Sequence, residues 1–170
     1  MRKILVATLS SAALLTAAGT ALADTQTSFI NVSATVLKNC AVTSNPLAFG
    51  NYTPNSGALT GNTTIKVNCT KGSAFTVSLN AGTTTGGTVA QRLMTDGTNT
   101  LQYNLYKDAG LSTIFGDGSG GSATQTDNGK GMSPASAWSY TVYGSLPDSA
   151  TNQDAPPGSY TDKITVTVSY

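Results

Sequence analysis

The stretch that decides the fold is Lys163-Ile164-Thr165-Val166-Thr167-Val168-Ser169-Tyr170, with which the sequence ends. Its large residues alternate with threonine and serine, so an extended chain here has one apolar and one polar face. We therefore expect a strong final β-strand at an open edge of a sheet. A second alternating run lies near the other end of the chain and places Ile30, Val32, Ala34 and Val36 on one face. Together, the two runs predict chains that complete one another.

The first 23 residues have the pattern of a secretory signal peptide. Arg2 and Lys3 precede a short stretch of small and apolar residues, and Ala21-Leu22-Ala23 is a small-x-small cleavage sequence. The alternative is an N-terminal membrane anchor, which is disfavoured because the apolar stretch is short and interrupted by serine, threonine and glycine. We expect cleavage before Asp24 and export of the remaining chain.

The mature chain, residues 24–170, has the length of one domain and carries little charge. Two of the nine Lys and Arg residues fall in the leader, so seven remain against eight Asp, with no Glu and no His. The resulting net charge, about −1, argues against nucleic acid or an anionic membrane as a partner, because both require a basic patch. The abundant Thr and Val favour strands, and the Gly, Asn and Asp favour turns.

The two cysteines, Cys40 and Cys69, predict one disulfide, because the chain is expected to be exported. Such a bond would close a loop of about 30 residues and stabilise the fold by about 3–4 kcal/mol in the chain-entropy model. A redox or metal pair is the alternative, but the chain has no His and no Cys-x-x-Cys spacing.

Strand patterns separated by turn residues recur along the mature chain, and no helix is expected. Two of them, Thr63–Cys69 and Phe75–Leu79, flank the tight turn Lys71-Gly72-Ser73 and predict a β-hairpin. Asp117 to Ser133 is expected to be a long polar loop. Seven to nine short strands with this spacing predict an antiparallel β-sandwich. The other expected strands are 29–37, 47–52, 92–94, 101–106, 114–116, 138–146 and 159–170.

The sequence offers few residues for catalysis. Without His or Glu, neither a Ser–His–Asp nor a Cys–His arrangement can form. We therefore predict no enzyme, no catalytic or metal-ligating residue and no cofactor. Most Asp residues are expected to form turns, as in Asp96-Gly97, Asp117-Gly118, Asp127-Asn128-Gly129 and Asp148-Ser149. Calcium at Asp117 and Asp127 is an alternative, although the EF-hand pattern is absent.

The sequence does not decide the roles of several aromatic residues and of Arg92. Trp138 and the tyrosines Tyr103, Tyr140 and Tyr160 could form a sugar-binding surface, but residues of this kind at strand positions more often belong to the core. Arg92, the only arginine of the mature chain, could pair with Asp162 or Asp108 or be solvated.

Several short patterns occur in a definite order along nearly all of the mature chain, and together they carry a resemblance. The most informative are Phe49-Gly50-Asn51-Tyr52, Cys69-Thr70-Lys71-Gly72 and Gly158-Ser159-Tyr160-Thr161-Asp162. Arg92-Leu93-Met94, Leu101-Gln102-Tyr103-Asn104-Leu105-Tyr106 and Tyr143-Gly144-Ser145-Leu146-Pro147 lie between the last two. In this order and spacing the chain resembles the spore coat protein U domain family, which includes the subunits of archaic chaperone–usher pili.

The resemblance implies an all-β fold, an incomplete immunoglobulin-like antiparallel β-sandwich that lacks its last strand. A donor strand from another subunit would complete it by β-augmentation. In such a family a periplasmic chaperone first fills the open groove, and the N-terminal segment of the next subunit replaces it at an outer-membrane usher. In this chain the donor strand would insert Ile30, Val32, Ala34 and Val36. The acceptor edge strand would present Ile164, Val166, Val168 and Tyr170.

The expected organisation is a signal peptide (1–23), a donor segment (24–36) and a pilin domain (37–170). The expected function is that of a structural pilus subunit, exported through the periplasm to a cell-surface pilus for adhesion and biofilm formation. Its partners would be identical or related pilin subunits, the periplasmic chaperone and the outer-membrane usher. The alternatives are a spore-coat or cell-surface structural protein and a secreted carbohydrate-binding β-sandwich.

Overall fold

The computed structural model describes residues 23–170 of the chain. The chain divides into two units, a segment up to Thr35 and a body from Val36 to Tyr170. The expected signal peptide, residues 1–23, lies outside the described residues except for Ala23, and it stays a prediction. None of the helices in the described part of the chain is long and apolar enough to cross a membrane.

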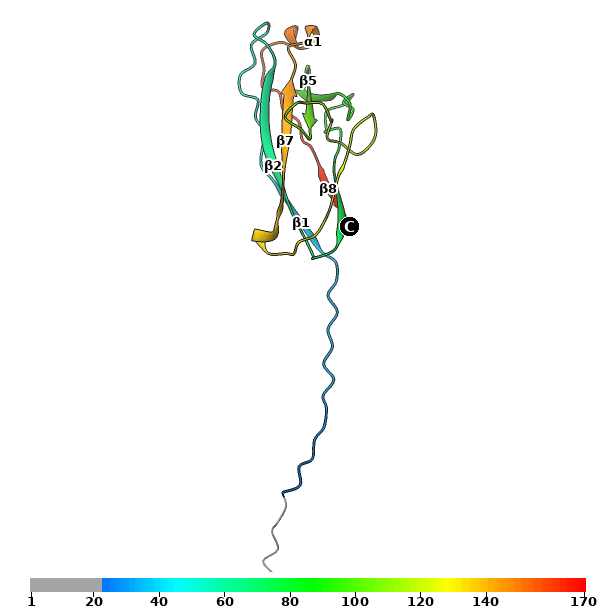
Figure 1. Cartoon of the computed structure of the whole chain (residues 1–170). Helices are drawn as coiled ribbons and strands as arrows, with labels where there is room; N and C mark the ends of the chain where they lie inside the picture. Colours follow the sequence, from blue (N-terminus) through cyan, green and yellow to red (C-terminus); the bar gives the residue numbers. More distant parts are fainter. Residues whose placement is uncertain (1–22) are drawn as a thin grey trace, which may run out of the picture. The chain divides into compact units, whose positions relative to one another are not determined.

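The regular secondary structure of the body is almost entirely antiparallel strands arranged in two sheets, which confirms the expected all-β fold class (Figure 1). One sheet has the strand order β1-β2-β7-β5-β4 and the other has the order β6-β3-β8. A single helical turn, α1 (Ala150–Gln153), and a 3-10 turn (Pro134–Ser136) interrupt the strands. The strands are β1 (Cys40–Ser44), β2 (Leu59–Cys69), β3 (Ala74–Leu79), β4 (Arg92–Thr95), β5 (Thr100–Tyr106), β6 (Gln125–Asn128), β7 (Trp138–Leu146) and β8 (Val166–Ser169).

The two sheets enclose an apolar core that follows the period-two pattern of the strands. Along β3, β7 and the second half of β2 the inward residues are buried and their neighbours are more exposed, whereas in β5 Asn104 is buried together with Tyr103 and Leu105. Cys69 belongs to this core and is bonded to Cys40, which lies directly opposite it in the β1–β2 pairing. The predicted disulfide is therefore confirmed. The core residues are Ile65, Val67, Cys69, Phe75, Val77, Leu79, Leu101, Tyr103, Leu105, Phe115, Val142 and Leu146.

The expected hairpin between Thr63–Cys69 and Phe75–Leu79 is wrong. Both segments form strands, but β2 pairs with β1 and β7, whereas β3 pairs with β6 and β8. The turn at Lys71-Gly72-Ser73 therefore connects the two sheets. The apolar residues of the two strands face each other across the core, and this buries them more completely than neighbouring positions within one sheet would.

Several strand boundaries also differ from the sequence prediction. Residues 29–37 and 47–52 form no strand, and the last strand begins at Val166 instead of Ser159. The expected loop between Asp117 and Ser133 contains β6, whose residues Gln125-Thr126-Asp127-Asn128 pair with β3. The bounds of β7 were predicted correctly, because its apolar residues alternate. Alternation does not reveal a polar edge strand, and it does not show whether a partner strand is present.

Arg92 takes none of the roles that the sequence left open, because it is neither solvated nor bonded to Asp162 or Asp108. Its side chain is fully buried. The guanidinium donates from Nε to the carbonyl oxygen of Asn80 (3.0 Å), from Nη1 to Oδ1 of Asn104 (2.7 Å) and from Nη2 to the carbonyl oxygen of Phe115 (2.8 Å). One side chain thus satisfies three acceptors on separate segments, two of which are loops.

We expect Arg92→Met to lower the free energy of unfolding by about 3 kcal/mol or more, because it leaves three buried or half-buried acceptors without a hydrogen-bond donor. Arg92→Lys should also destabilise the protein, since an ammonium group cannot reach three acceptors with the geometry of a guanidinium. The measurement is urea unfolding followed by tryptophan fluorescence. Lys66→Met, at an exposed position of β2, is the matched control. An equal loss of unfolding free energy in Lys66→Met would contradict the stabilising role given to the buried Arg92.

Candidate functional site

A groove of about 1110 Å³ opens into the side of the sandwich. One wall is formed by residues 44–54, which follow β1, and the other by residues 155–166, which lead into β8. Core residues of both sheets line its floor, so the apolar interior is accessible along this side. These floor residues are Ile65, Leu79, Leu101, Tyr103, Leu105, Val142 and Leu146.

Two glycines explain why the first wall lies so close to the five-stranded sheet. A Cβ atom on Gly144 of β7 would lie 2.9 Å from side-chain carbons of Leu47 and Phe49. A Cβ atom on Gly61 of β2 would lie 3.3 Å from the carbonyl oxygen of Ala48. Because these positions lack side chains, Leu47 and Phe49 pack against the core without belonging to a strand.

The second wall ends in a strand that has a free edge. β8 pairs with β3, from Leu79↔Val166 to Thr76↔Ser169, and no other strand of the described residues pairs with it. Its backbone therefore presents unpaired hydrogen-bonding groups beside an apolar groove. This is the position that a further strand would occupy.

The structure brings three of the four predicted acceptor residues to the apolar side. Ile164, Val166 and Val168 are half-buried and pack against the core, and the first two also line the groove. Tyr170 does not join them, since it is 56% exposed. Ile164 lies before β8, so the groove wall is longer than the paired strand.

The predicted donor residues lie in an exposed segment without secondary structure. Ile30, Val32 and Val36 are 90%, 90% and 83% exposed, and Ala34 is exposed as well. The neighbouring Phe29 is also exposed. A run of this kind is unusual for a soluble protein, in which large exposed apolar surfaces mark interaction sites.

Asp162 holds the wall that leads into β8, a role that the sequence did not indicate. Its carboxylate accepts hydrogen bonds from the Tyr103 hydroxyl (2.6 Å) and from the backbone amides of Thr83 (2.8 Å) and Thr84 (3.2 Å). Burial acts to raise the pKa of Asp162, but the hydrogen bonds from Tyr103 and Thr83 outweigh it and lower the pKa. Asp162 thus joins the groove wall to the core and to the loop after β3.

Several other aspartates accept hydrogen bonds from the backbone or from side chains. Asp96 and Asp117 accept hydrogen bonds from backbone amides two or three residues further on, as expected for turn formers, and Asp108 does so from Thr113. Asp148 differs from the prediction, because it accepts from the amides of Asn55 and Gly57, which are distant in the sequence. Asp127 differs from the prediction, because it lies in β6 and accepts a hydrogen bond from the Tyr140 hydroxyl. Within residues 23–170, no group of three or more His, Cys, Asp or Glu side chains could hold a metal ion.

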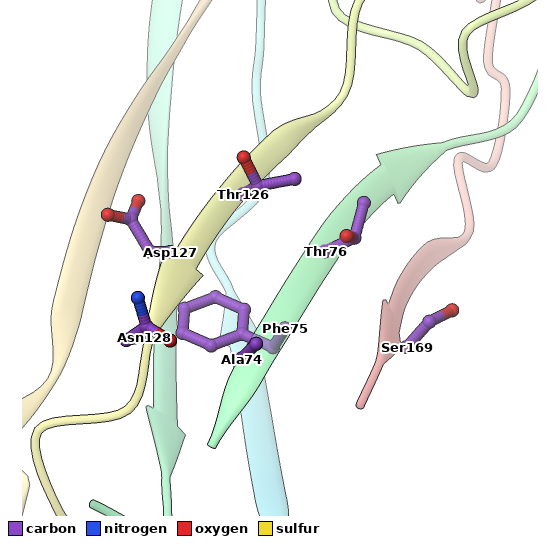
Figure 2. A pocket seen from close by; sticks show the side chains of 7 residues that line it. All are labelled: Ala74, Phe75, Thr76, Thr126, Asp127, Asn128 and Ser169. Atoms are coloured by element: carbon purple, nitrogen blue, oxygen red, sulfur yellow. The ribbon is translucent and has the colours of Figure 1, made fainter. Parts of the chain in front are cut away.

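A second, smaller pocket of about 370 Å³ lies on the three-stranded sheet. Figure 2 shows that its side chains are spread over β3, β6 and β8 and do not converge on a common point. The pocket therefore lacks the convergent polar groups that a ligand site requires. Its lining residues are Ala74, Phe75, Thr76, Thr126, Asp127, Asn128 and Ser169.

The arrangement of strands and groove agrees with comparisons with known proteins. The model of the Spore Coat Protein U domain matches residues 26–167. The chain belongs to this family. A search of curated proteins gave no match.

The Spore Coat Protein U domain of this chain is also similar to a solved structure. That structure is the CsuC–CsuE chaperone–tip adhesion subunit pre-assembly complex from archaic chaperone–usher Csu pili of Acinetobacter baumannii. The TM-score is 0.55 at 23% sequence identity, and the match covers 80% of this chain and 40% of the solved one. The likeness supports the immunoglobulin-like fold, and this chain spans less than half the length of that relative.

We expect Asp162→Asn to flatten the acid dependence of stability. Because the folded-state pKa is lowered, the stabilisation by this carboxylate is complete above the ordinary Asp value of about 3.9 and is lost as pH falls through the folded-state pKa. The measurement is the urea midpoint between about pH 6 and about pH 3. Asp154→Asn, at the exposed C-cap of α1, is the control. If the urea midpoints of the wild type and of Asp162→Asn fell equally with decreasing pH, the stabilising role of the Asp162 carboxylate would be disproved.

Proposed function

We propose that this protein is a structural, non-enzymatic subunit of a chaperone–usher pilus and that it polymerises by donor-strand exchange. The observation that carries the proposal is the apolar groove beside the free edge of β8, in a chain that also has an exposed, alternating apolar segment. Family membership supports it, as does the similarity to a complex described as part of archaic chaperone–usher pili.

The pattern of the donor segment matches that of the strand it would join. Three apolar residues at the end of the chain, Ile164, Val166 and Val168, face the core. The residue that follows each of them, Thr165, Thr167 or Ser169, is exposed. Residues 30–36 repeat this order, with Asn31, Ser33 and Thr35 between the apolar residues. Inserted beside β8, the segment would place its apolar side chains in the groove and its polar side chains on the outer face of the sheet.

Insertion would stabilise both partners. Burial of one Val or Ile side chain contributes about 1.5–3 kcal/mol, and the backbone edge of β8 would gain hydrogen-bond partners. Until a subunit donates its segment, both the groove and the segment expose apolar surface that promotes aggregation. A periplasmic chaperone that supplies a temporary strand, and an outer-membrane usher that exchanges it, would resolve this problem.

In this proposal residues 1–23 are the signal peptide, residues 24–36 the donor segment and residues 37–170 the pilin domain. The partners are copies of the chain or related subunits, and the product is a cell-surface fibre for attachment and biofilm formation. The donor residues are Ile30, Val32, Ala34 and Val36, and the acceptor edge is β8 with Ile164.

We expect Val32→Asp to abolish polymers of the mature chain, since a carboxylate would enter an apolar groove at high cost. Ser33→Asp adds the same charge to the adjacent outward position and should leave polymerisation almost unchanged. The readout is a ladder on SDS gels that disappears on boiling. Equal behaviour of the two variants would show that residues 30–36 are not inserted with this alternation.

A second experiment tests the groove itself. A chain that starts at Leu37 should aggregate, whereas the same chain with residues 25–36 attached through a flexible linker after Tyr170 should be a soluble monomer. The attached segment should raise the melting temperature by at least 10 °C, which corresponds to roughly 2 kcal/mol or more for a domain of this size. A stable monomer without the segment, unchanged by its addition, would mean that the sandwich is complete.

A further inference from the structure

The two ends of the body differ in charge. The basic end carries three exposed lysines, Lys38, Lys71 and Lys130, and one half-buried aspartate, Asp127, whose carboxylate accepts hydrogen bonds from Tyr140 and Gln125. They come from three segments that hydrogen bonds hold together. Thr70 donates its amide to the carbonyl oxygen of Asn39 (2.9 Å), and Gly72 donates to the carbonyl oxygen of Gly129 (2.8 Å). Lys130 is also held in place, since its Nζ lies 3.3 Å from the centroid of the Trp138 ring.

The opposite end carries three aspartates, Asp96, Asp148 and Asp154. Asp148 precedes α1 and accepts hydrogen bonds from the amides of Asn55 and Gly57, and Asp154 is the exposed C-cap of the same helix. Asp96 lies in the turn between β4 and β5, close to Gly158 in the segment that follows α1, since a Cβ atom on Gly158 would lie 3.1 Å from Oδ2 of Asp96.

The strands show that these are opposite ends of the same sandwich. β2 begins at Leu59, opposite Leu146 and so next to Asp148, and it ends at Cys69, next to Lys71. At about 3.3 Å per residue this strand separates the two ends by roughly 30 Å. Of the remaining exposed lysines, Lys66 lies on β2 three residues before Cys69, and Lys163 lies two residues after Thr161, which pairs with Thr95 next to Asp96.

The chain between the donor segment and the body is short and held at the basic end. Thr70 Oγ1 accepts a hydrogen bond from the amide of Asn39 (3.0 Å) and donates to the carbonyl oxygen of Leu37 (3.4 Å). From Val36 to Asn39 the backbone spans at most about 11 Å. A donor segment inserted up to Val36 therefore brings the basic end of its own body within about one Debye length of the acceptor.

Charge and strand direction both indicate that the basic end of the donor subunit meets the acidic end of the acceptor. All strand pairs in both sheets are antiparallel, and β8 runs toward the basic end, because Ser169 lies opposite Thr76 near the start of β3. An antiparallel donor strand leaves the groove at the acidic end of the acceptor. A parallel one would leave at the basic end and bring like charges together.

We propose that the basic end of one copy (Lys38, Lys71, Lys130) docks against the acidic end of the next copy (Asp96, Asp148, Asp154) and thereby aligns consecutive subunits. The partner is a second copy of this chain, and the inference rests on the proposed polymerisation. Such a contact joins two different surfaces, so it does not close on itself and repeats along a fibre. Its main effect is on the rate of association and on register. Hydrogen bonds keep the pKa of Asp96 at about 2 and lower that of Asp148, so these two groups stay charged at neutral pH.

The test uses the mature chain, residues 24–170, refolded by dilution and followed on unboiled SDS gels. Lys38→Glu/Lys71→Glu should polymerise roughly tenfold more slowly than wild type at about 50 mM NaCl, and the difference should nearly vanish at about 500 mM NaCl. Adding Asp154→Lys should restore part of the rate at low salt. Lys66→Glu, which changes one exposed lysine on β2 about 10 Å before the basic end, is the control and should be slowed much less than Lys38→Glu/Lys71→Glu.

The outcomes separate the two proposals. If wild type forms no SDS-resistant polymer at either salt concentration, the proposed function and the docking contact are both wrong. If wild type polymerises but Lys38→Glu/Lys71→Glu is as fast at low salt, or Lys66→Glu is equally slow, only the docking contact is overturned. Melting temperatures of all variants before polymerisation establish that a slow variant is folded, and a second pair, Lys130→Gln and Lys71→Gln, repeats the test with charge removal alone.

Discussion

The proposed function depends on one feature of the fold, the free edge of β8 beside an apolar groove. The outer strand of a sheet leaves one row of backbone N–H and C=O groups unpaired, and the apolar residues of a sandwich need a facing layer. Here β8 has one partner, β3, and the core floor next to it is open to a groove of about 1110 Å³. In the proposed function, this feature would make the isolated body prone to aggregation and would be the site for another chain.

Polar contacts hold the walls of the groove in place. Arg92 binds the carbonyl oxygen of Asn80, and Asn80 in turn accepts the amide of Thr165 through Oδ1 (2.8 Å) just before β8 begins. Asp162 joins the same wall to Tyr103 in the core. These contacts link the core to the open edge, so the groove is organised before a strand enters it. An organised site loses less conformational entropy on binding.

The distribution of charge adds a direction to this site. The body has few charges, but lysines gather at the end from which the N-terminal segment emerges, and aspartates gather around α1 at the other. Apolar burial in the groove has little dependence on orientation, whereas charges at the two ends distinguish one orientation from the other. Strand insertion would supply affinity and the end charges would supply alignment.

The sequence by itself determined the all-β class, most strands, the disulfide partners and the alternating runs at both ends, because period-two patterns and cysteine pairing are local or nearly local signals. Only the tertiary structure decided that β2 and β3 belong to different sheets, that Gln125–Asn128 is a strand and that Arg92 is buried among carbonyl groups. These outcomes depend on which segments meet across the core. A polar edge strand such as β6, or a charge such as Arg92, gains its place from partners far away in the sequence, and no local pattern encodes them.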